Sequence, residues 1–517
     1  MTRGRRWAAA LTAFLAVAAA LLTPNGGGRP APGAACEPWS TALTVRQSAV
    51  QKRLLGLRLL NYYPSTAPWT ALWTAWDPGR LDTDFATIAA LGANAMRLVV
   101  QPAAFGYPTP AADRLAQLRQ AVQLAALHGL SVQLTLFDWW NGYRDTAGSD
   151  RWARAVLAPY RDDPRIAFVE LKNEVDPADP ATAAWLRHEL PVVRTAAGGT
   201  PVTVSVTGPD PVARLRTLRT VLAADPPDFY DLHYYESPGA ARATFEAAEA
   251  AVAPAALFIG ETGAATGPPL SEAAQDLYLR TVEWAAGSAG LPDAAPWIFQ
   301  DLTAADVPAG AEQGAAALSY GLLRTDGTAK PAAAAVRALF QGHGDDPAFD
   351  AFDGDFGQGS GASPADWSPH AVGGAEAAWD PADGHHAPGS VVLARTSAGS
   401  TFTVTPVLQP TAAGEPVRLT AWARGVRSTG QNRIAIVWHD RLSHYLGEDD
   451  SPVLAAGTTP WHPLAVDSTA PRCAAFATLA LKSQHDTGQA RFDDVAFTAA
   501  PRGADRHRVV AARSSAG

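Results

Sequence analysis

Two short segments of this chain contain residues whose types and spacing could do chemistry, residues 168–174 (FVELKNE) and 257–263 (LFIGETG). Each is an apolar run of strand type that leads into a carboxylate, Glu174 in the first and Glu261 in the second. In a parallel α/β barrel, acids at the C-terminal ends of strands lie on the catalytic face. Two such carboxyl groups about 5–5.5 Å apart can cleave a glycosidic bond by double displacement, one as proton donor and the other as nucleophile.

Each acid also has a plainer interpretation. Glu174 could belong to an Asn-Glu pair in a surface loop, and Glu261 could open a following helix. The apolar residues before Glu174 disfavour the loop, while Thr262, Gly263 and two later prolines delay any helix after Glu261. We therefore expect Glu174 to be the proton donor and Glu261 the nucleophile. The side-chain amide of Asn173, directly before Glu174, is available to a sugar hydroxyl.

An arginine, Arg97, stands in the middle of another predicted strand, in the run MRLVV. A buried arginine needs an anion beside it. Glu261 is one candidate partner, and this pair would keep the nucleophile ionised. Glu170, whose place in its strand also points inward, is the other candidate, and that pair would be structural.

Three polar-tipped rings, His233, Tyr234 and Tyr235, end the sixth predicted strand. A hydroxyl there would hydrogen-bond the nucleophile. His233 could bind a sugar hydroxyl or orient the proton donor, and a purely structural histidine is the alternative.

Tryptophan is abundant, at 16 residues, and its faces suit both sugar rings and protein cores. Trp297, in the eighth predicted strand, would form an apolar floor under a sugar ring. The other candidates for a binding cleft, in or near the loops after the first and third strands, are Trp73, Trp76, Trp139 and Trp140.

The segments that must position these residues alternate between strand type and helix type. The strand candidates are residues 54–61, 95–101, 131–137, 166–173, 202–207, 229–234, 256–261 and 297–301, and amphipathic segments lie between them at 113–128, 181–196, 212–224 and 271–286. Repeated βα units imply a parallel sheet, and eight of them in about 290 residues predict a closed (β/α)8 barrel over residues 45–342. The alternative, a doubly wound open sheet, usually has a Gly-rich turn after its first strand, where this chain reads NYYP.

The composition changes after the predicted barrel. Residues 343–355 are rich in glycine and aspartate and are predicted to be a linker. Residues 356–499 contain short alternating runs separated by turn residues, which is typical of an antiparallel β-sandwich or jelly roll. Residues 500–517 are basic and polar, and we expect a disordered tail.

The first 35 residues are predicted to be a signal peptide and a low-complexity leader. Arginines at 3, 5 and 6 precede an apolar run that is short for a membrane span, which needs ~20 residues. A retained membrane anchor and lipid attachment at Cys36 are the alternatives. The expected location is therefore secreted or at the cell surface.

The overall composition limits the kinds of molecule that the protein is expected to bind. The net charge is −9 and no long basic run is present, which argues against nucleic acid as a partner. Cys36 and Cys473 are the only cysteines, so no zinc cluster can be built from thiols, although the two could pair in an exported protein. We expect a monomer with a carbohydrate substrate, no stable protein partner and no cofactor for the chemistry.

The predicted barrel, over about residues 50–342, resembles the cellulase-like glycoside hydrolases of clan A, especially family 5. The resemblance is carried by NYYPS from Asn61, LGANAMR ending at Arg97, ELKNE ending at Glu174, HYY from His233, and Gly260-Glu261 with the closing segment YGLLRTDGTAKP over 320–331. It implies Glu174 as acid/base and Glu261 as nucleophile, with Arg97, Asn173, His233, Tyr235 and Trp297 around the central sugar. The usual Asn-Glu-Pro is here NEVDP, and the His often found after strand three is replaced by FDWW over 137–140.

The C-terminal part resembles a galactose-binding-like carbohydrate-binding module. Phe356 with Trp367, the run AWAR ending at Arg424, and FDDVAF over 492–497 carry this resemblance. It implies a possible structural Ca²⁺, with Asp494 as the best ligand candidate. Exposure of both Asp493 and Asp494 to solvent is the alternative.

The sequence thus predicts an exported retaining β-glycosidase that acts on a β-glycan such as cellulose, mannan or a related polymer. The main alternative is a non-catalytic sugar-binding or cell-surface protein on a decayed barrel, which the presence of both carboxylates and Arg97 disfavours. A metal-dependent hydrolase is a third possibility, but it would need several histidines at strand ends, and His233 is the only one there.

Overall fold

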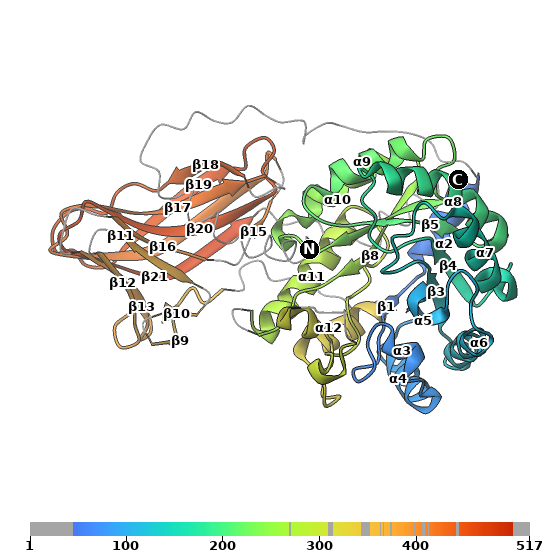
Figure 1. Cartoon of the computed structure of the whole chain (residues 1–517). Coiled ribbons are helices and arrows are strands. Elements are labelled where there is room, and N and C mark those ends of the chain that lie inside the picture. The colour runs from blue at the N-terminus through green and yellow to red at the C-terminus, as the bar shows by residue number, and fades with distance from the viewer. Residues whose placement is uncertain are drawn as a thin grey trace. The chain divides into compact units, whose positions relative to one another are not determined.

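The computed structural model describes residues 45–267, 270–308, 314–342, 352–361, 363–365, 367–372, 375–395, 400–405, 409–411, 413–440 and 444–499. The predicted signal segment, Cys36, most of the predicted linker and the tail after residue 499 lie outside these ranges. The chain divides into two compact units, a barrel and a sandwich, and each is described by itself (Figure 1).

Parallel strands form the centre of the first unit. They are β1 (Leu59–Asn61), β2 (Ala95–Val99), β3 (Ser131–Thr135), β4 (Ile166–Glu170), β5 (Val202–Thr203), β6 (Ser205–Val206), β7 (Phe229–Tyr234) and β8 (Ala256–Thr262). Their order is β1-β2-β3-β4-β5 in one sheet and β6-β7-β8 in the next. Only Val204 separates β5 from β6, so the two sheets continue into one another.

Residues 295–300 close the ring between β8 and β1. On one side, the Thr262 amide donates to the Ala295 carbonyl and the Trp297 amide donates to the Thr262 carbonyl. On the other side, the Asn61 amide donates to the Pro296 carbonyl and the Phe299 amide donates to the Asn61 carbonyl. The predicted (β/α)8 barrel is thereby confirmed.

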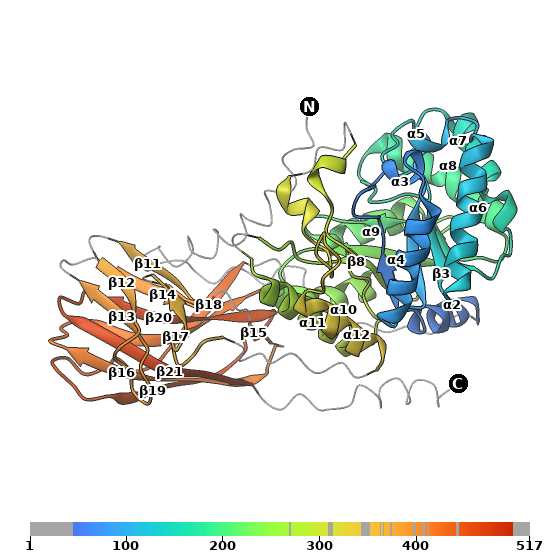
Figure 2. The same ribbon diagram turned by 90° about the horizontal axis from the view of Figure 1, so that it is seen from below.

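Helices surround these strands on the outside (Figures 1 and 2). They are α2 (Val45–Leu55), α3 (Ala71–Thr74), α4 (Pro78–Ala90), α5 (Pro102–Phe105), α6 (Ala112–Leu127), α7 (Thr146–Leu157), α8 (Pro180–Ala197), α9 (Pro211–Val221), α10 (Ala241–Val252), α11 (Glu272–Ser288) and α12 (Pro331–Phe340), with short 3₁₀ turns at Ala158–Tyr160, Pro238–Ala240, Ala304–Asp306 and Ala315–Leu318. Helix α6 shows why they form, because its buried residues, Leu118, Ala121, Val122 and Ala125, recur at the spacing of one helix face. No helix among the described residues is both long and apolar enough to cross a membrane.

The predicted first strand, 54–61, is wrong in its first half. Residues up to Leu55 belong to α2, and β1 begins only at Leu59. Val50 and Leu54, four residues apart on one face of α2, are buried in a cluster with residues that begin the strands, such as Ala95 and Ala256. The apolar face of α2 therefore covers the N-terminal end of the barrel.

The second unit is built mainly of two packed antiparallel sheets, which can be followed as two layers in Figure 2, with a small two-stranded sheet of β9 and β10 beside them in the chain. Its strands are β9 (Gly359–Ser360), β10 (Ser363–Pro364), β11 (Ser368–Val372), β12 (Ala375–Asp380), β13 (Ser390–Arg395), β14 (Ser400–Val404), β15 (Gln409–Pro410), β16 (Pro416–Val426), β17 (Gln431–His439), β18 (Tyr445–Asp450), β19 (His462–Thr469), β20 (Phe476–Gln484) and β21 (Gln489–Ala499). One sheet has the order β11-β14-β20-β17-β18 and the other β12-β13-β21-β16-β19. Alternate residues of β16 are buried, as expected for a strand with one face in the core. The predicted β-sandwich is confirmed.

Candidate active site

Glu174 lies in the turn that follows β4 rather than in the strand itself. The strand was predicted to reach residue 173 but ends at Glu170. Glu174 has a φ of 48°, a conformation that is uncommon for residues with a side chain. Its amide donates a 2.8 Å hydrogen bond to Ser205 Oγ in β6, which ties the turn to the barrel. The Glu174 side chain is 27% exposed, so solvent and a substrate can reach it.

Glu261 is inside β8 and is almost completely buried, at 4% exposure. Tyr235 Oη donates a 2.7 Å hydrogen bond to Glu261 Oε2, and Arg97 Nη1 contacts Oε1. Gly260 precedes it because a Cβ at that position would lie 2.3 Å from Asp231 Oδ1 on the neighbouring strand β7. Both oxygens of the Glu261 carboxylate are thus held by donors, one from β2 and one from the residue after β7.

His233 lies between the two acids. Its Nδ1 is 3.1 Å from Glu174 Oε1 and 3.3 Å from Glu261 Oε1. One carboxylate oxygen from each acid and a ring nitrogen of His233 all lie within 4.8 Å of one another. The β7–β8 register shifts between Leu232 and His233, which changes the position of the ring relative to the regular ladder. The two acids that are distant in sequence are therefore close in space.

Arg97 contacts both acidic partners that the sequence left open. Its side chain is 1% exposed, and Nη2 lies 2.7 Å from Glu170 Oε2 while Nη1 contacts Glu261. Arg97 also donates to Thr135 Oγ1 at 2.8 Å and to Asn173 Oδ1 at 2.7 Å. One guanidinium therefore connects the buried acid of β4, the acid of β8 and the amide beside Glu174.

Burial and charge set the protonation of this cluster. Burial acts to lower the pKa of His233, but the carboxylates of Glu261, Glu174 and Asp231 outweigh it and raise that pKa to about 9. The raised pKa favours the protonated ring, in which Nδ1 can donate a hydrogen bond to a carboxylate. Burial raises the pKa of Glu261, and the charges of His233 and Arg97 act against that rise.

A row of aromatic rings begins at Trp297, whose amide donates to the carbonyl of Thr262, the residue after Glu261. Trp297, half-buried, meets the ring of Tyr63 edge-on at 6.1 Å. Tyr63 also packs at 6.0 Å against Trp69, which stacks on Trp139 at 5.6 Å. Trp139 is 37% exposed, so this row of rings has an accessible end.

The remaining tryptophan candidates pack elsewhere. Trp76 stacks on Trp73 at 5.9 Å, and the buried Trp73 donates to the Val99 carbonyl at 2.8 Å. Trp140 packs against Phe137 at 5.0 Å and Trp185 at 5.2 Å. The rings of these tryptophans therefore pack against other aromatic rings of the protein itself.

Several residues of the cluster were not predicted as site residues. Asn61 accepts from Arg97 at 3.1 Å, Asp138 accepts from Asn173 at 3.2 Å, and Ser205 donates to Glu170 at 2.5 Å. Each is a polar residue within or directly after an apolar strand, and that exception to the apolar pattern is the signal that could have found them.

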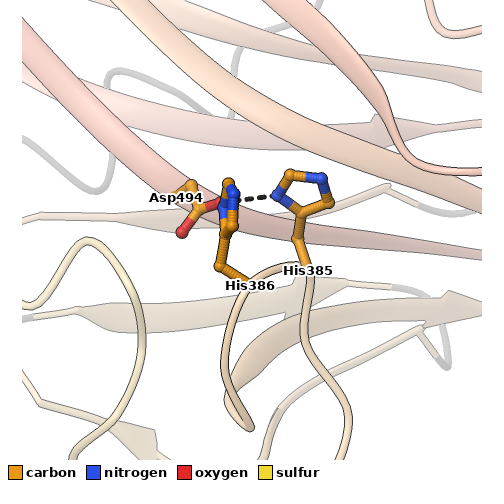
Figure 3. Close-up of side chains that lie close together, drawn as sticks. All are labelled: His385, His386 and Asp494. Atoms are coloured by element: carbon orange, nitrogen blue, oxygen red, sulfur yellow. Dashed lines mark hydrogen bonds and ion pairs between the residues drawn. The ribbon is translucent and has the colours of Figure 1, made fainter.

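Asp494, the predicted calcium ligand, lies in β21 of the sandwich. Its Oδ2 contacts ring nitrogens of two adjacent histidines, His385 and His386 (Figure 3). Neither histidine was predicted from the sequence to be a ligand.

No family model matches this sequence, and no curated protein matches it. Solved structures do match. GH5_18 from Streptomyces cattleya in complex with Manβ1-4GlcNAc has 19% identity and a TM-score of 0.46, over 56% of this chain and 80% of that one. The exo-β-1,4-mannosidase Op5Man5 from Opitutaceae bacterium strain TAV5 has 18% identity and a TM-score of 0.47, over 55% of this chain and 59% of that one. GH5_18 from Bifidobacterium longum subsp. longum has 18% identity and a TM-score of 0.46, over 56% and 79%. These values are too low to transfer an activity to this chain, so its function must be argued from the site.

Proposed function

We propose that the barrel is a retaining β-glycosidase that hydrolyses O-glycosidic bonds by double displacement. The observation that carries this proposal is the separation of the two acids, since one oxygen of Glu174 and one of Glu261 lie within 4.8 Å of each other. Retaining enzymes place their carboxyl groups about 5–5.5 Å apart, whereas inverting enzymes leave about 6.5–9.5 Å for a water molecule. The short separation favours direct attack of one carboxylate on the anomeric carbon of the sugar.

The surroundings of the two acids support one assignment of their roles. Glu261 is buried and held by Tyr235 and Arg97, as a nucleophile with a fixed direction of attack requires. Glu174 is more exposed, as an acid/base residue must be to meet first the leaving group and later a water.

In the first step, Glu261 attacks the anomeric carbon while Glu174 gives its proton to the departing glycosidic oxygen. The sugar is then joined to Glu261 as an ester. In the second step, Glu174 takes a proton from a water molecule, which attacks the same carbon and releases Glu261. Neither step requires a cofactor.

The polar groups beside the acids suit a sugar ring. Asn173 directly precedes Glu174 and hydrogen-bonds Asp138 at 3.2 Å, and we propose that this polar pair binds sugar hydroxyls. The rings of Trp297 and Trp139 offer faces on which a sugar can stack. We propose a β-glycan of the cellulose or mannan type as substrate, and an exported protein that meets it outside the cell, because the N-terminal segment has the pattern of a signal peptide.

The test uses an aryl β-glycoside panel with Glu261→Ala and Glu174→Ala. Glu261→Ala should lose turnover, and azide should restore it with an inverted product. Glu174→Ala should keep its first step on substrates with good leaving groups, because these need no proton. Glu272→Ala, in a surface ion pair with Arg324, is the matched control and should be unaffected.

Two outcomes would contradict this proposal, one for the roles of the acids and one for catalysis itself. If azide rescues Glu174→Ala with inversion instead, the two roles are exchanged. If the wild-type protein binds glycans but turns over none of the panel, the non-catalytic sugar-binding alternative is correct.

A further inference from the structure

We propose that the C-terminal sandwich contains a site for a divalent transition metal of the Zn²⁺ type, formed by His385, His386 and Asp494. Each histidine places its Nδ1 2.6 Å from the same oxygen, Asp494 Oδ2. The three ligand atoms lie within 4.8 Å of one another (Figure 3). The histidines come from the loop between β12 and β13 and the aspartate from β21, so an ion would join a loop to a strand.

The loop that carries the histidines is held in place by the residue next to Asp494. Asp493 is 1% exposed, and its two oxygens accept from the amides of His385 at 2.5 Å and Asp494 at 2.7 Å. One buried carboxylate thus fixes the backbone of a histidine ligand and of the aspartate ligand together. Gly384 permits this loop, because a Cβ there would lie 1.9 Å from the Ala387 carbonyl oxygen.

The ring of His385 is also fixed. It stacks on Trp422 with centroids 3.9 Å apart and planes at 18°, and it meets Trp461 at 5.7 Å. The His385 side chain is only 16% exposed, whereas that of His386 is 75% exposed. The site therefore has a rigid inner ligand and an open outer side, where water or another ligand can complete the coordination.

The chemistry of the donors selects the metal. Two imidazole nitrogens and one carboxylate oxygen suit Zn²⁺, which is bound at about 2.0–2.2 Å by such ligands. Ca²⁺ prefers six to eight oxygens, and this set has one carboxylate. Asp494 is still expected to bind a cation, but the proposed ion is Zn²⁺ instead of the Ca²⁺ that the resemblance implied. A bound ion would replace the two 2.6 Å contacts between the Nδ1 atoms and Asp494 Oδ2.

The test is calorimetric titration of the tag-free, metal-stripped full chain with ZnCl₂ and, separately, with CaCl₂. The wild type should bind one Zn²⁺ at this site, and His386→Ala should weaken that binding by at least about tenfold. His386 is exposed, so this variant should fold normally, and circular dichroism verifies it. Asp494→Asn should weaken binding as well.

Two matched controls locate the site. His462→Ala removes an exposed histidine of the same sandwich, and His188→Ala removes one from a His and acid group in the barrel. Both should bind Zn²⁺ as the wild type does. As a second readout, Co²⁺ should give a visible absorption band in the wild type that His386→Ala loses.

Three results would overturn the proposal. The first is an absence of Zn²⁺ binding to the wild type. The second is wild-type Zn²⁺ affinity in both His386→Ala and Asp494→Asn. The third is Ca²⁺ binding that depends on Asp494 and is indifferent to His386, which would restore a calcium site.

Discussion

Arg97→Met should destabilise the barrel and remove its activity. Methionine has a similar length but no charge, so the substitution leaves Glu170 and Glu261 buried without their shared cation. Removing one partner of a buried ion pair typically costs about 3–5 kcal/mol. Turnover should fall too, because Glu261 loses the contact that orients one of its oxygens.

The pKa of Glu170 indicates how this cost should depend on pH. Burial acts to raise its pKa, but Arg97, His233 and the hydroxyls of Ser205 and Thr135 outweigh it and lower the pKa from 4.5 to about 2. At about 1.4 kcal/mol per pKa unit, this shift is worth about 3 kcal/mol of stability. A depressed carboxylate pKa stabilises the fold above the unfolded value, and that stability is lost as the pH falls from 4.5 towards 2. The wild type and Arg97→Met should therefore differ most at neutral pH and converge in acid.

The assay is urea unfolding followed by tryptophan fluorescence at pH 7 and at pH 3.5, alongside turnover of an activated aryl glycoside. Arg154→Met, which removes an exposed helical ion pair with Asp150, is the control and should change stability by less than about 1 kcal/mol. Adding Glu170→Gln to Arg97→Met should recover part of the lost stability, because one stranded charge disappears. Wild-type unfolding and turnover in Arg97→Met would refute the reasoning, and a cost that is equal at both pH values would refute its electrostatic basis.

Three further outcomes are expected. Tyr235→Phe removes the 2.7 Å bond to Glu261 and should lower kcat by roughly 10- to 100-fold, since a hydrogen bond to a charged group is worth about 1.5–3 kcal/mol; unchanged kcat would contradict this. Burial raises the pKa of Glu189 from 4.5 to about 7, so wild-type stability should fall as the pH rises through this window; Glu189→Gln should be up to about 3 kcal/mol more stable than the wild type at pH 8 and no different near pH 4, as urea unfolding would reveal. If the sandwich binds glycan, deleting residues 345–517 should spare turnover of small soluble glycosides and reduce activity on insoluble polymer, whereas equal losses on both would favour a structural role.

The predicted elements were correct where one spacing of apolar residues extended over a whole segment. The alternation of apolar runs with amphipathic segments predicted the barrel, and alternating apolar residues predicted the sandwich. The prediction was wrong at residues 54–55, where an apolar run serves α2 rather than a strand, because a short apolar run has no period of its own. The eighth strand position, 297–301, was placed from its apolar residues, although it joins the ring through only a few backbone hydrogen bonds.

The amino-acid sequence by itself determined which groups could act. Two strand-end acids, a mid-strand arginine and a cluster of polar rings are choices of residue type, and side-chain chemistry can be read without coordinates. The tertiary structure decided how they meet: His233 lies between Glu174 and Glu261, and Arg97 contacts two acids rather than one. It also placed His385 and His386 against Asp494, more than a hundred residues away in sequence. Such contacts depend on strand register and on the turns between elements, which set side-chain directions that no local pattern specifies.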